Sequence, residues 1–154
     1  MAEQPTCTCG QNEKRRIIFP CAGQANTGQI TNLAAIQLTE EGFGSIACVA
    51  LLATGAEGIL ANARNADEVV VLDGCPMLCA KKIAEAQGVP VGQHIVVTDL
   101  GIAKGPSKSY TDDDVEAVVS AVWEGKGRVE TKTASKGKKP DNGGCGCGCG
   151  GGCR

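Results

Sequence analysis

Cysteine is the residue type in this sequence with the most chemistry to offer. The chain has ten cysteines in 154 residues. Four of them are spread between residues 21 and 79: Cys21, Cys48, Cys75 and Cys79. Thiolate sulfur is a soft ligand for Zn²⁺, Cu⁺ and iron–sulfur clusters, and a free thiolate is a nucleophile. These cysteines therefore indicate either a metal centre or thiol chemistry.

A second group of cysteines is closely spaced near the end of the sequence. The group alternates with glycine and consists of Cys145, Cys147, Cys149 and Cys153. Because glycine restricts the backbone little, four such sulfurs can wrap one soft ion. A low-complexity tail is the alternative, but exposed thiols without a ligand oxidise easily, so we expect a second, mobile metal site. Cys7 and Cys9 form a further pair that can complete either site.

Composition and charge exclude several classes of partner. No apolar run approaches the roughly 20 residues that a membrane helix needs, and the start lacks the layout of a secretory signal. We therefore expect a cytoplasmic protein with no membrane partner, whose thiols stay reduced. Residues 1–125 hold 8 Lys and Arg against 15 Asp and Glu, whereas residues 126–154 hold 7 against 2. An acidic body argues against a nucleic-acid partner, because phosphate contacts need a basic face.

The elements that must position the cysteines alternate along residues 16–124. Short, continuous apolar runs are typical of strands buried on both faces. They lie at Arg16–Pro20, Ser45–Ala50, Glu68–Leu72 and His94–Thr98. Segments with helical spacing lie at Gly28–Glu41, Ala56–Asn65, Pro76–Gln87 and Asp112–Glu124. Thr111 and Asp114 predict a capping box at the start of the last helix, and Pro76 suits the first position of the third.

This alternation predicts an α/β fold, a small four-stranded parallel sheet with flanking helices of the Rossmann or flavodoxin-like kind. We prefer the strand order 2-1-3-4. The domain is expected to span residues 15–125. A flexible leader at 1–14, with the Cys-X-Cys pair, precedes it. A basic, Gly/Cys-rich tail at 126–154 follows, and its composition predicts disorder.

The predicted fold gathers the first group of cysteines at one edge of the sheet. Ligands of such sheets bind beyond the carboxyl ends of the strands, at a switch point in strand order. Cys21 directly follows the first strand and Cys75 ends the third, so adjacent strands place them about 5 Å apart. Cys48 joins them if its strand is suitably staggered. The alternative for Cys48 is ordinary core packing, because free cysteine is often buried.

Cys75 and Cys79 are spaced four residues apart at the expected start of the third helix. Residues i and i+4 share a helix face, so the two sulfurs can converge. The helix dipole there favours thiolate, and Lys81 and Lys82 add positive potential. Four thiolates around one point form a zinc site.

Other polar residues are weaker candidates. His94 begins a strand, at the opposite end from Cys21 and Cys75, and we expect a structural role for it. Asp73 and Asp99 both follow strands and either orient a ligand or satisfy a loop or helix N-terminus, which is the commoner outcome. Glycine-rich phosphate loops are absent from the sequence, so phosphoryl transfer is not favoured.

The segment Val70–Lys82, with the sequence VVLDGCPMLCAKK, resembles the signature of the DGC-domain family of zinc-binding proteins. The resemblance extends over about residues 15–125 and includes PCAG at Pro20–Gly23 and VTDLG at Val97–Gly101. It implies a zinc site whose ligands are Cys21, Cys48, Cys75 and Cys79. The Gly/Cys-rich tail lies outside the resemblance.

The sequence therefore predicts a cytoplasmic, cysteine-rich metal-binding protein for zinc or another thiophilic ion such as Cu(I). Two metal sites suit a carrier or scavenger that exchanges its ion with a metal-donor or acceptor protein, and no catalytic residue is assigned. One alternative is a thiol enzyme for redox, persulfide or metalloid chemistry that uses Cys75 and Cys79. Another is an Fe–S cluster on four thiolates.

Overall fold

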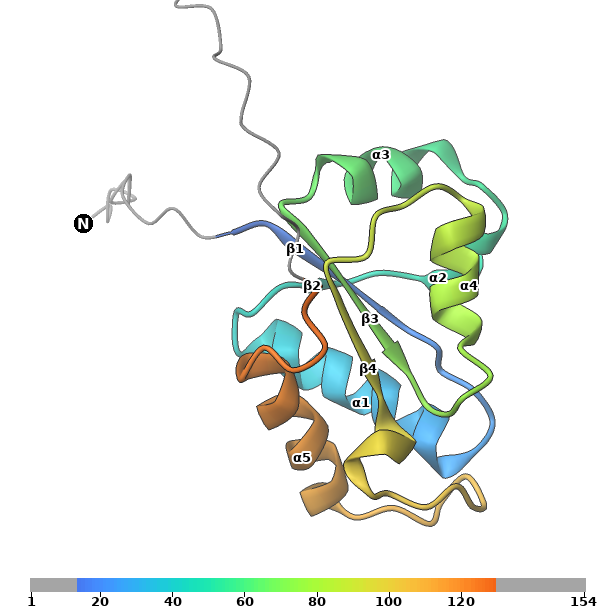
Figure 1. Cartoon of the computed structure of the whole chain (residues 1–154), viewed down its shortest axis with the longest axis vertical. Helices are drawn as coiled ribbons and strands as arrows, with labels where there is room; N and C mark the ends of the chain where they lie inside the picture. Colours follow the sequence, from blue (N-terminus) through green and yellow to red (C-terminus); the bar gives the residue numbers. More distant parts are fainter. Residues whose placement is uncertain (1–13, 130–154) are drawn as a thin grey trace, which may run out of the picture.

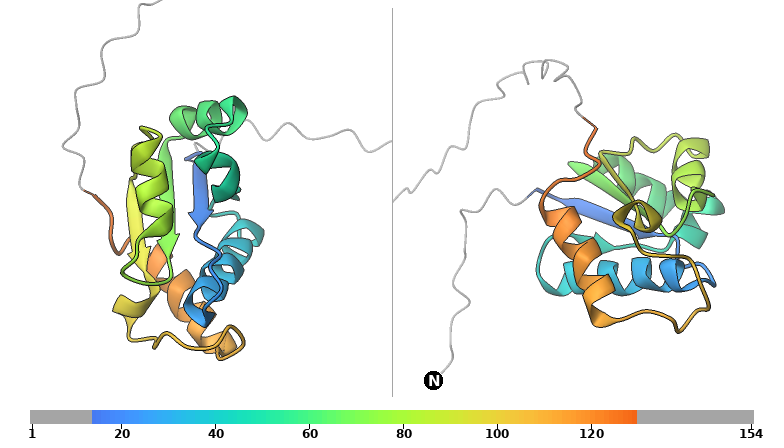
Figure 2. Two further views of the ribbon diagram at one scale, coloured as in Figure 1. Left: turned by 90° about the vertical axis from the view of Figure 1, so that its right-hand side faces the viewer. Right: turned by 60° about the horizontal axis from the view of Figure 1, so that its bottom comes forward.

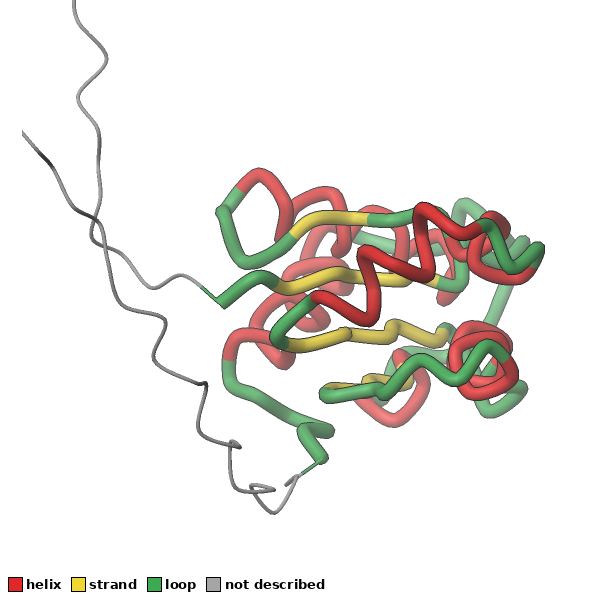
Figure 3. The backbone as a smooth tube through the Cα atoms, turned by 90° about the horizontal axis from the view of Figure 1, so that it is seen from above, coloured by secondary structure: helices red, strands yellow, loops and turns green. Residues whose placement is uncertain are grey.

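The computed structural model describes residues 14–129, in which four parallel strands form a sheet between two layers of helices (Figure 1). The strands are β1 (Arg16–Pro20), β2 (Ser45–Ile46), β3 (Glu68–Asp73) and β4 (Gln93–Val96). Their order is β2-β1-β3-β4, and the four lie side by side (Figure 3). The predicted α/β class and the order 2-1-3-4 are both confirmed.

Helices cover both faces of the sheet (Figure 2). They are α1 (Asn26–Glu40), α2 (Val49–Ala53), α3 (Glu57–Asn65), α4 (Cys79–Ala86), the short 3-10 helix η1 (Val97–Leu100) and α5 (Asp112–Trp123). Helices α1 and α5 pack on one face, and α2, α3 and α4 pack on the other. Within residues 14–129, no helix is both long and apolar enough to cross a bilayer.

The core lies on both sides of the strands because alternate side chains point to opposite faces. The side chains facing α1 and α5 are Ile18, Val70, Leu72 and Ile95. Those facing α2, α3 and α4 are Ile17, Phe19, Val69 and Val71. Burial on both faces explains why the strands are continuously apolar in sequence rather than alternating.

The second strand is shorter than predicted, and a helix follows it that the sequence did not reveal. Pairing with β1 covers Ser45 and Ile46 and ends where the backbone N–H of Ala47 donates to the Ile18 carbonyl at 2.9 Å. Cys48 is then the N-cap residue of α2, in which Leu52 is fully buried. The predicted strand Ser45–Ala50 therefore ends early, because burying Leu52 turns the chain into a helix.

The third predicted helix starts later than expected. Cys75–Leu78 forms a turn in which the Leu78 N–H donates to the Cys75 carbonyl at 3.2 Å, and α4 begins at Cys79. The prediction that Cys75 and Cys79 share one helix face is therefore wrong. The fourth strand also ends early, at Val96, because Val97–Leu100 winds into η1.

The described chain continues past α5 to residue 129. Helix α5 begins with the predicted capping box, in which the Asp114 N–H donates to Thr111 Oγ1 at 3.3 Å. Beyond α5, the Val129 N–H donates to the Gly92 carbonyl at 3.0 Å, so residues 126–129 contact the amino end of β4. Cys7, Cys9 and the tail cysteines lie outside the described residues.

Candidate functional site

Three neighbouring strands each lead into a cysteine at the carboxyl edge of the sheet. Cys48 follows β2, Cys21 follows β1 and Cys75 follows β3. The strand order therefore places Cys21 between the other two along this edge. The switch point lies between β1 and β3, because β1 continues to β2 on one side and β3 continues to β4 on the other. This is the place where a sheet of this type binds ligands.

The thiol of Cys21 connects the loops that follow β1 and β3. The backbone N–H of Gly74 donates to Cys21 Sγ at 3.3 Å. On its other side Cys21 Sγ lies 3.6 Å from the hydroxyl of Thr31, which donates its own hydrogen to the Gly28 carbonyl at 2.7 Å. A protonated Cys21 thiol therefore donates to Thr31 and accepts from Gly74. This half-buried sulfur has a defined position beside the switch point.

Close backbone packing fixes how the two loops meet. A Cβ atom on Gly74 would lie 2.7 Å from the backbone nitrogen of Gly28 and 2.8 Å from the carbonyl carbon of Thr27. A Cβ atom on Gly28 would in turn lie 2.6 Å from the backbone nitrogen of Gly23. Contacts of this kind are possible only without a side chain. The glycine of the Asp-Gly-Cys segment therefore lets the loop of Cys75 lie directly against the start of α1.

The carboxylate of Asp73 connects the loop of Cys75 to the start of α4 through hydrogen bonds. Its side chain is 1% exposed and accepts from the backbone N–H groups of Ala80 at 2.9 Å and Lys81 at 3.1 Å. These are first-turn donors of α4 with no partner inside the helix. Asp73 thus caps a helix seven residues away, the commoner of its two expected roles. It also explains why α4 begins at Cys79 rather than at Pro76.

His94 completes this cap. Its Nε2 atom lies 2.9 Å from Asp73 Oδ2. The sequence placed His94 at the opposite end of the sheet from the cysteines, but its ring reaches the carboxyl end of β3. The other aspartate considered, Asp99, is exposed in η1.

A lysine that the sequence did not reveal lies beside Cys75. The ammonium group of Lys104, on the loop between η1 and α5, lies 3.6 Å from Cys75 Sγ. Lys81, which the sequence favoured, instead lies 4.0 Å from Glu85. Cys75 is therefore the described cysteine with a positive charge at hydrogen-bonding distance.

The buried side chain of Asn26 positions the loop of Lys104. Its amide group donates to the carbonyls of Ala103 at 2.9 Å and Ser109 at 2.8 Å. Its oxygen accepts from the Gly105 N–H at 2.7 Å. The partners are 77 to 83 residues away in sequence, so no local pattern could have identified them. Asn26 and Lys104 are the site residues that sequence reasoning missed.

The Asp73-Gly74-Cys75 arrangement belongs to a domain known in other proteins, since the sequence profile of the DGC domain matches residues 17–122. The chain belongs to the DGC-domain family. The match runs from β1 into α5 and includes Cys21, Cys48, Cys75 and Cys79.

One curated relative of this DGC protein is the anaerobic and virulence modulator AnvM of Pseudomonas aeruginosa. The two are 24% identical over 100 residues, which cover 65% of this chain and 76% of AnvM. No solved structure matches the chain.

Backbone strain in this DGC domain is found next to its cysteines. Within residues 14–129, the two non-glycine residues with positive φ are Ala22, at +46°, and Leu78, at +54°. Ala22 directly follows Cys21, and Leu78 directly precedes Cys79. Such a conformation costs an L-residue about 1–2 kcal/mol and is common at functional sites. The strain marks the same loops as the hydrogen bonds to sulfur.

Cys48 lies on the other side of Cys21, and the two line one surface pocket of about 500 Å³. Its walls include the apolar side chains of Pro20, Ile46 and Val49. Cys48 is exposed and Cys21 is half-buried. The pocket therefore lies at the end of β1 on its β2 side, with both thiols in its lining.

The described cysteines do not assemble a closed metal site of the predicted kind. Among the residues from 14 to 129, no three His, Cys, Asp or Glu side chains gather closely enough to hold one ion. The residues described do not, as they stand, fit a resident zinc ion with four protein ligands. Zinc binding by Cys21, Cys48, Cys75 and Cys79 remains a prediction. So does metal binding by the tail cysteines, which lie outside the described residues.

The contact between Lys104 and Cys75 predicts a difference in thiol reactivity. Replacing Lys104 with glutamine removes the charge beside Cys75 Sγ, and alkylation of Cys75 is expected to slow about two- to threefold, the range for an exposed charge pair. Mass spectrometry after timed iodoacetamide treatment measures this rate for each cysteine. Lys108→Gln, in the same loop, is the matched control and should leave the rate unchanged. Equal rates in wild type and Lys104→Gln would contradict the assignment.

Proposed function

We propose that this protein binds a thiophilic metal ion as cargo at the carboxyl edge of its sheet, through the thiolates of Cys21 and Cys75. The observation that supports this best is the contact of the Gly74 N–H with Cys21 Sγ at 3.3 Å. Because Gly74 immediately precedes Cys75, this contact fixes the two cysteine loops together at the switch point. Both cysteines lie at least partly open to solvent, as metal exchange requires.

The open arrangement favours a carrier or scavenger over a structural metal site. Structural zinc is usually enclosed by four protein ligands. Fewer protein ligands leave positions on the ion free for a sulfur of a donor or acceptor protein. The tail cysteines Cys145, Cys147, Cys149 and Cys153 are proposed as the ligands that this chain itself adds. Zn²⁺ and Cu⁺ are the ions that thiolates select, and we place the protein in the cytoplasm, where thiols stay reduced.

Metal titration of serine variants tests this proposal. The background variant has serine in place of Cys7, Cys9 and the four tail cysteines, so that only the described cysteines bind metal. In it, Cys21→Ser and Cys75→Ser are each expected to weaken Zn²⁺ or Cu⁺ binding at least tenfold, or about 1.4 kcal/mol. Anaerobic competition with a chromophoric chelator measures the affinity. Unchanged binding in the Cys21→Ser/Cys75→Ser double variant, with an unchanged circular dichroism spectrum, would contradict the proposal.

A thiol-based redox function is the second candidate, and the ammonium group of Lys104 beside Cys75 favours it. In this case Cys75 is the reactive thiol, and Cys79 at the start of α4 is the resolving one. The word anaerobic in the name of AnvM fits a protein whose thiols respond to oxygen. If the protein is purified without bound metal and alkylation is selective for Cys75, the redox function is favoured. Protection of both Cys21 and Cys75 by bound metal favours the carrier.

A further inference from the structure

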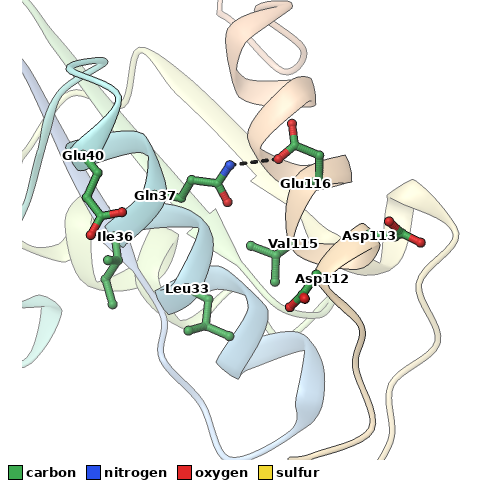
Figure 4. Close-up of a pocket in the computed structure, with 8 residues that line it drawn as sticks. All are labelled: Leu33, Ile36, Gln37, Glu40, Asp112, Asp113, Val115 and Glu116. Atoms are coloured by element: carbon green, nitrogen blue, oxygen red, sulfur yellow. Dashed lines mark hydrogen bonds between the residues drawn. The ribbon is translucent and has the colours of Figure 1, made fainter.

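Helices α1 and α5 enclose a surface groove of about 540 Å³ (Figure 4). These two helices lie on the face of the sheet opposite to α4. Its floor is apolar and is formed by Leu33, Ile36 and Val115. Carboxylates stand around the floor: Glu40, Asp112, Asp113 and Glu116. The groove therefore combines an apolar floor with a strongly acidic rim.

The acidic rim has no basic counterpart among the side chains that the structure describes. No lysine or arginine lines the groove, and none of the four carboxylates forms an ion pair within residues 14–129. Glu116 accepts from the amide of Gln37 at 2.8 Å, which leaves its charge in place.

Favourable interactions with the helix dipole account for only some of the carboxylates in this rim. Asp112 and Asp113 lie in the first turn of α5, where the helix dipole stabilises negative charge. Glu40 lies in the last turn of α1, where the same dipole destabilises it, and that turn holds no basic residue. Repulsion among the carboxylates adds to this cost. A cationic partner at the groove would offset both the unfavourable dipole interaction of Glu40 and the repulsion among the carboxylates.

Lysine side chains match such a surface. Their methylene stems cover apolar area while the ammonium group reaches outward to carboxylates. Ile36 offers this area, since it is 41% exposed. A basic peptide segment rich in lysine is therefore the chemistry that fits the groove.

The chain has such a segment directly after the described residues. Residues 130–139 contain four lysines, Lys132, Lys136, Lys138 and Lys139, against one acidic residue, Glu130. The rest of the segment is small or polar, so no bulky side chain hinders entry. Its charge is complementary to that of the groove.

Geometry allows this segment to reach the groove. The described chain ends at Val129, which is hydrogen-bonded to Gly92 at the amino end of β4. Helices α1 and α5 run opposite to the strands (Figure 1). The groove that they line therefore leads from the amino end of β4 toward the carboxyl edge. Helix α5 is about 18 Å long at 1.5 Å per residue. Ten extended residues span up to roughly 33 Å, which exceeds that length.

We propose that the segment Lys132–Lys139 binds in the groove between α1 and α5 of the same chain. Because the two are linked, their effective concentration is about millimolar, so weak contacts suffice. Binding in this direction leads Cys145–Cys153 toward the carboxyl edge, where Cys21 and Cys75 lie. Only this last consequence rests on the proposed metal-binding function. The docking itself does not need a metal ion.

Carbodiimide crosslinking of the full, metal-free chain tests the docking. This reagent joins carboxylates to lysines that touch them, and mass spectrometry locates the new amide bonds. Crosslinks are expected from Lys132–Lys139 to groove carboxylates at least fivefold above those to Glu57 and Glu85, exposed acids on α3 and α4. Their yield should not depend on protein concentration. It should fall at least threefold in about 1 M salt, where the Debye length is about 3 Å.

A pair of variants separates docking from mere reactivity. Glu40→Gln with Glu116→Gln is expected to lower crosslinking of Asp113 at least threefold. The control pair Glu57→Gln with Glu85→Gln should leave it unchanged. Crosslinks spread evenly over the molecule, or a yield that rises with protein concentration and so reports a second copy, would overturn the proposal. Because the chain is metal-free in this experiment, its result is independent of the metal titration.

Discussion

Replacing Asp73 with alanine is expected to lower the free energy of unfolding by about 3–4 kcal/mol. Hydrogen bonds to a charged group contribute about 1.5–3 kcal/mol each, and their donors are left unpaired when the acceptor is removed. Asp73 accepts from the N–H groups of Ala80 and Lys81 and contacts His94. The side chain of Asp73 is only 1% exposed, so its carboxylate makes these contacts away from water. Urea denaturation measures the loss as a lower midpoint at constant m value.

Two further variants serve as controls for Asp73→Ala. Asp99→Ala also removes an aspartate that follows a strand, but this residue is exposed, so a change below about 0.5 kcal/mol is expected. Asp73→Asn keeps the size and one acceptor oxygen, and its effect should lie between the two. If Asp73→Ala is no more destabilising than Asp99→Ala, Asp73 does not cap α4.

Features that depend on neighbours in sequence could be predicted from this chain. The runs RIIFP and EVVVL became β1 and most of β3, which continues to Asp73, because strands buried on both faces require continuous apolar residues. The start of α5 was predictable because both partners of its capping box, Thr111 and Asp114, lie three residues apart. Cys21 and Cys75 were placed at the ends of adjacent strands only through the preferred strand order 2-1-3-4, which the structure has.

Features that depend on distant partners could not be predicted. The start of α4 is set by Asp73, which lies outside the helix and reaches it across a turn, so the local signal of Pro76 was misleading. Cys48 was expected in a strand because SIACVA is mostly apolar, yet β2 has only one neighbour and ends at Ile46. The contact of Lys104 with Cys75 joins residues 29 positions apart.

The Asp-Gly-Cys segment illustrates both cases in three residues. The sequence correctly marks it as chemically special, but assigns its interest to the cysteine. In the structure the aspartate caps α4, the glycine contacts α1 and the cysteine lies beside Lys104. The first two residues thus position the third. Substitutions at them are therefore expected to change the protein more than substitutions of the exposed cysteines, Cys48 and Cys79.

Replacing Gly74 with alanine is expected to destabilise the protein by about 3 kcal/mol and to expose Cys21. The new methyl carbon would lie 2.7 Å from the backbone nitrogen of Gly28. Backbone atoms of a buried helix start cannot move aside as a flexible side chain can, and overpacking of this kind costs about 1–3 kcal/mol or more. Relief requires the loop after β3 to move away from α1. This breaks the contact of the Gly74 N–H with Cys21 Sγ.

A glycine in open space provides the matched control. A Cβ atom on Gly58, in α3, meets nothing within 4 Å, so Gly58→Ala should stabilise the protein by about 0.5–1 kcal/mol through helix propensity. The same substitution at two sites is thus expected to have opposite signs in urea denaturation. Alkylation of Cys21 should accelerate in Gly74→Ala alone. If Gly74→Ala is as stable as wild type with Cys21 equally protected, the two loops are not joined by this close contact, and the proposed pairing of Cys21 with Cys75 loses its support.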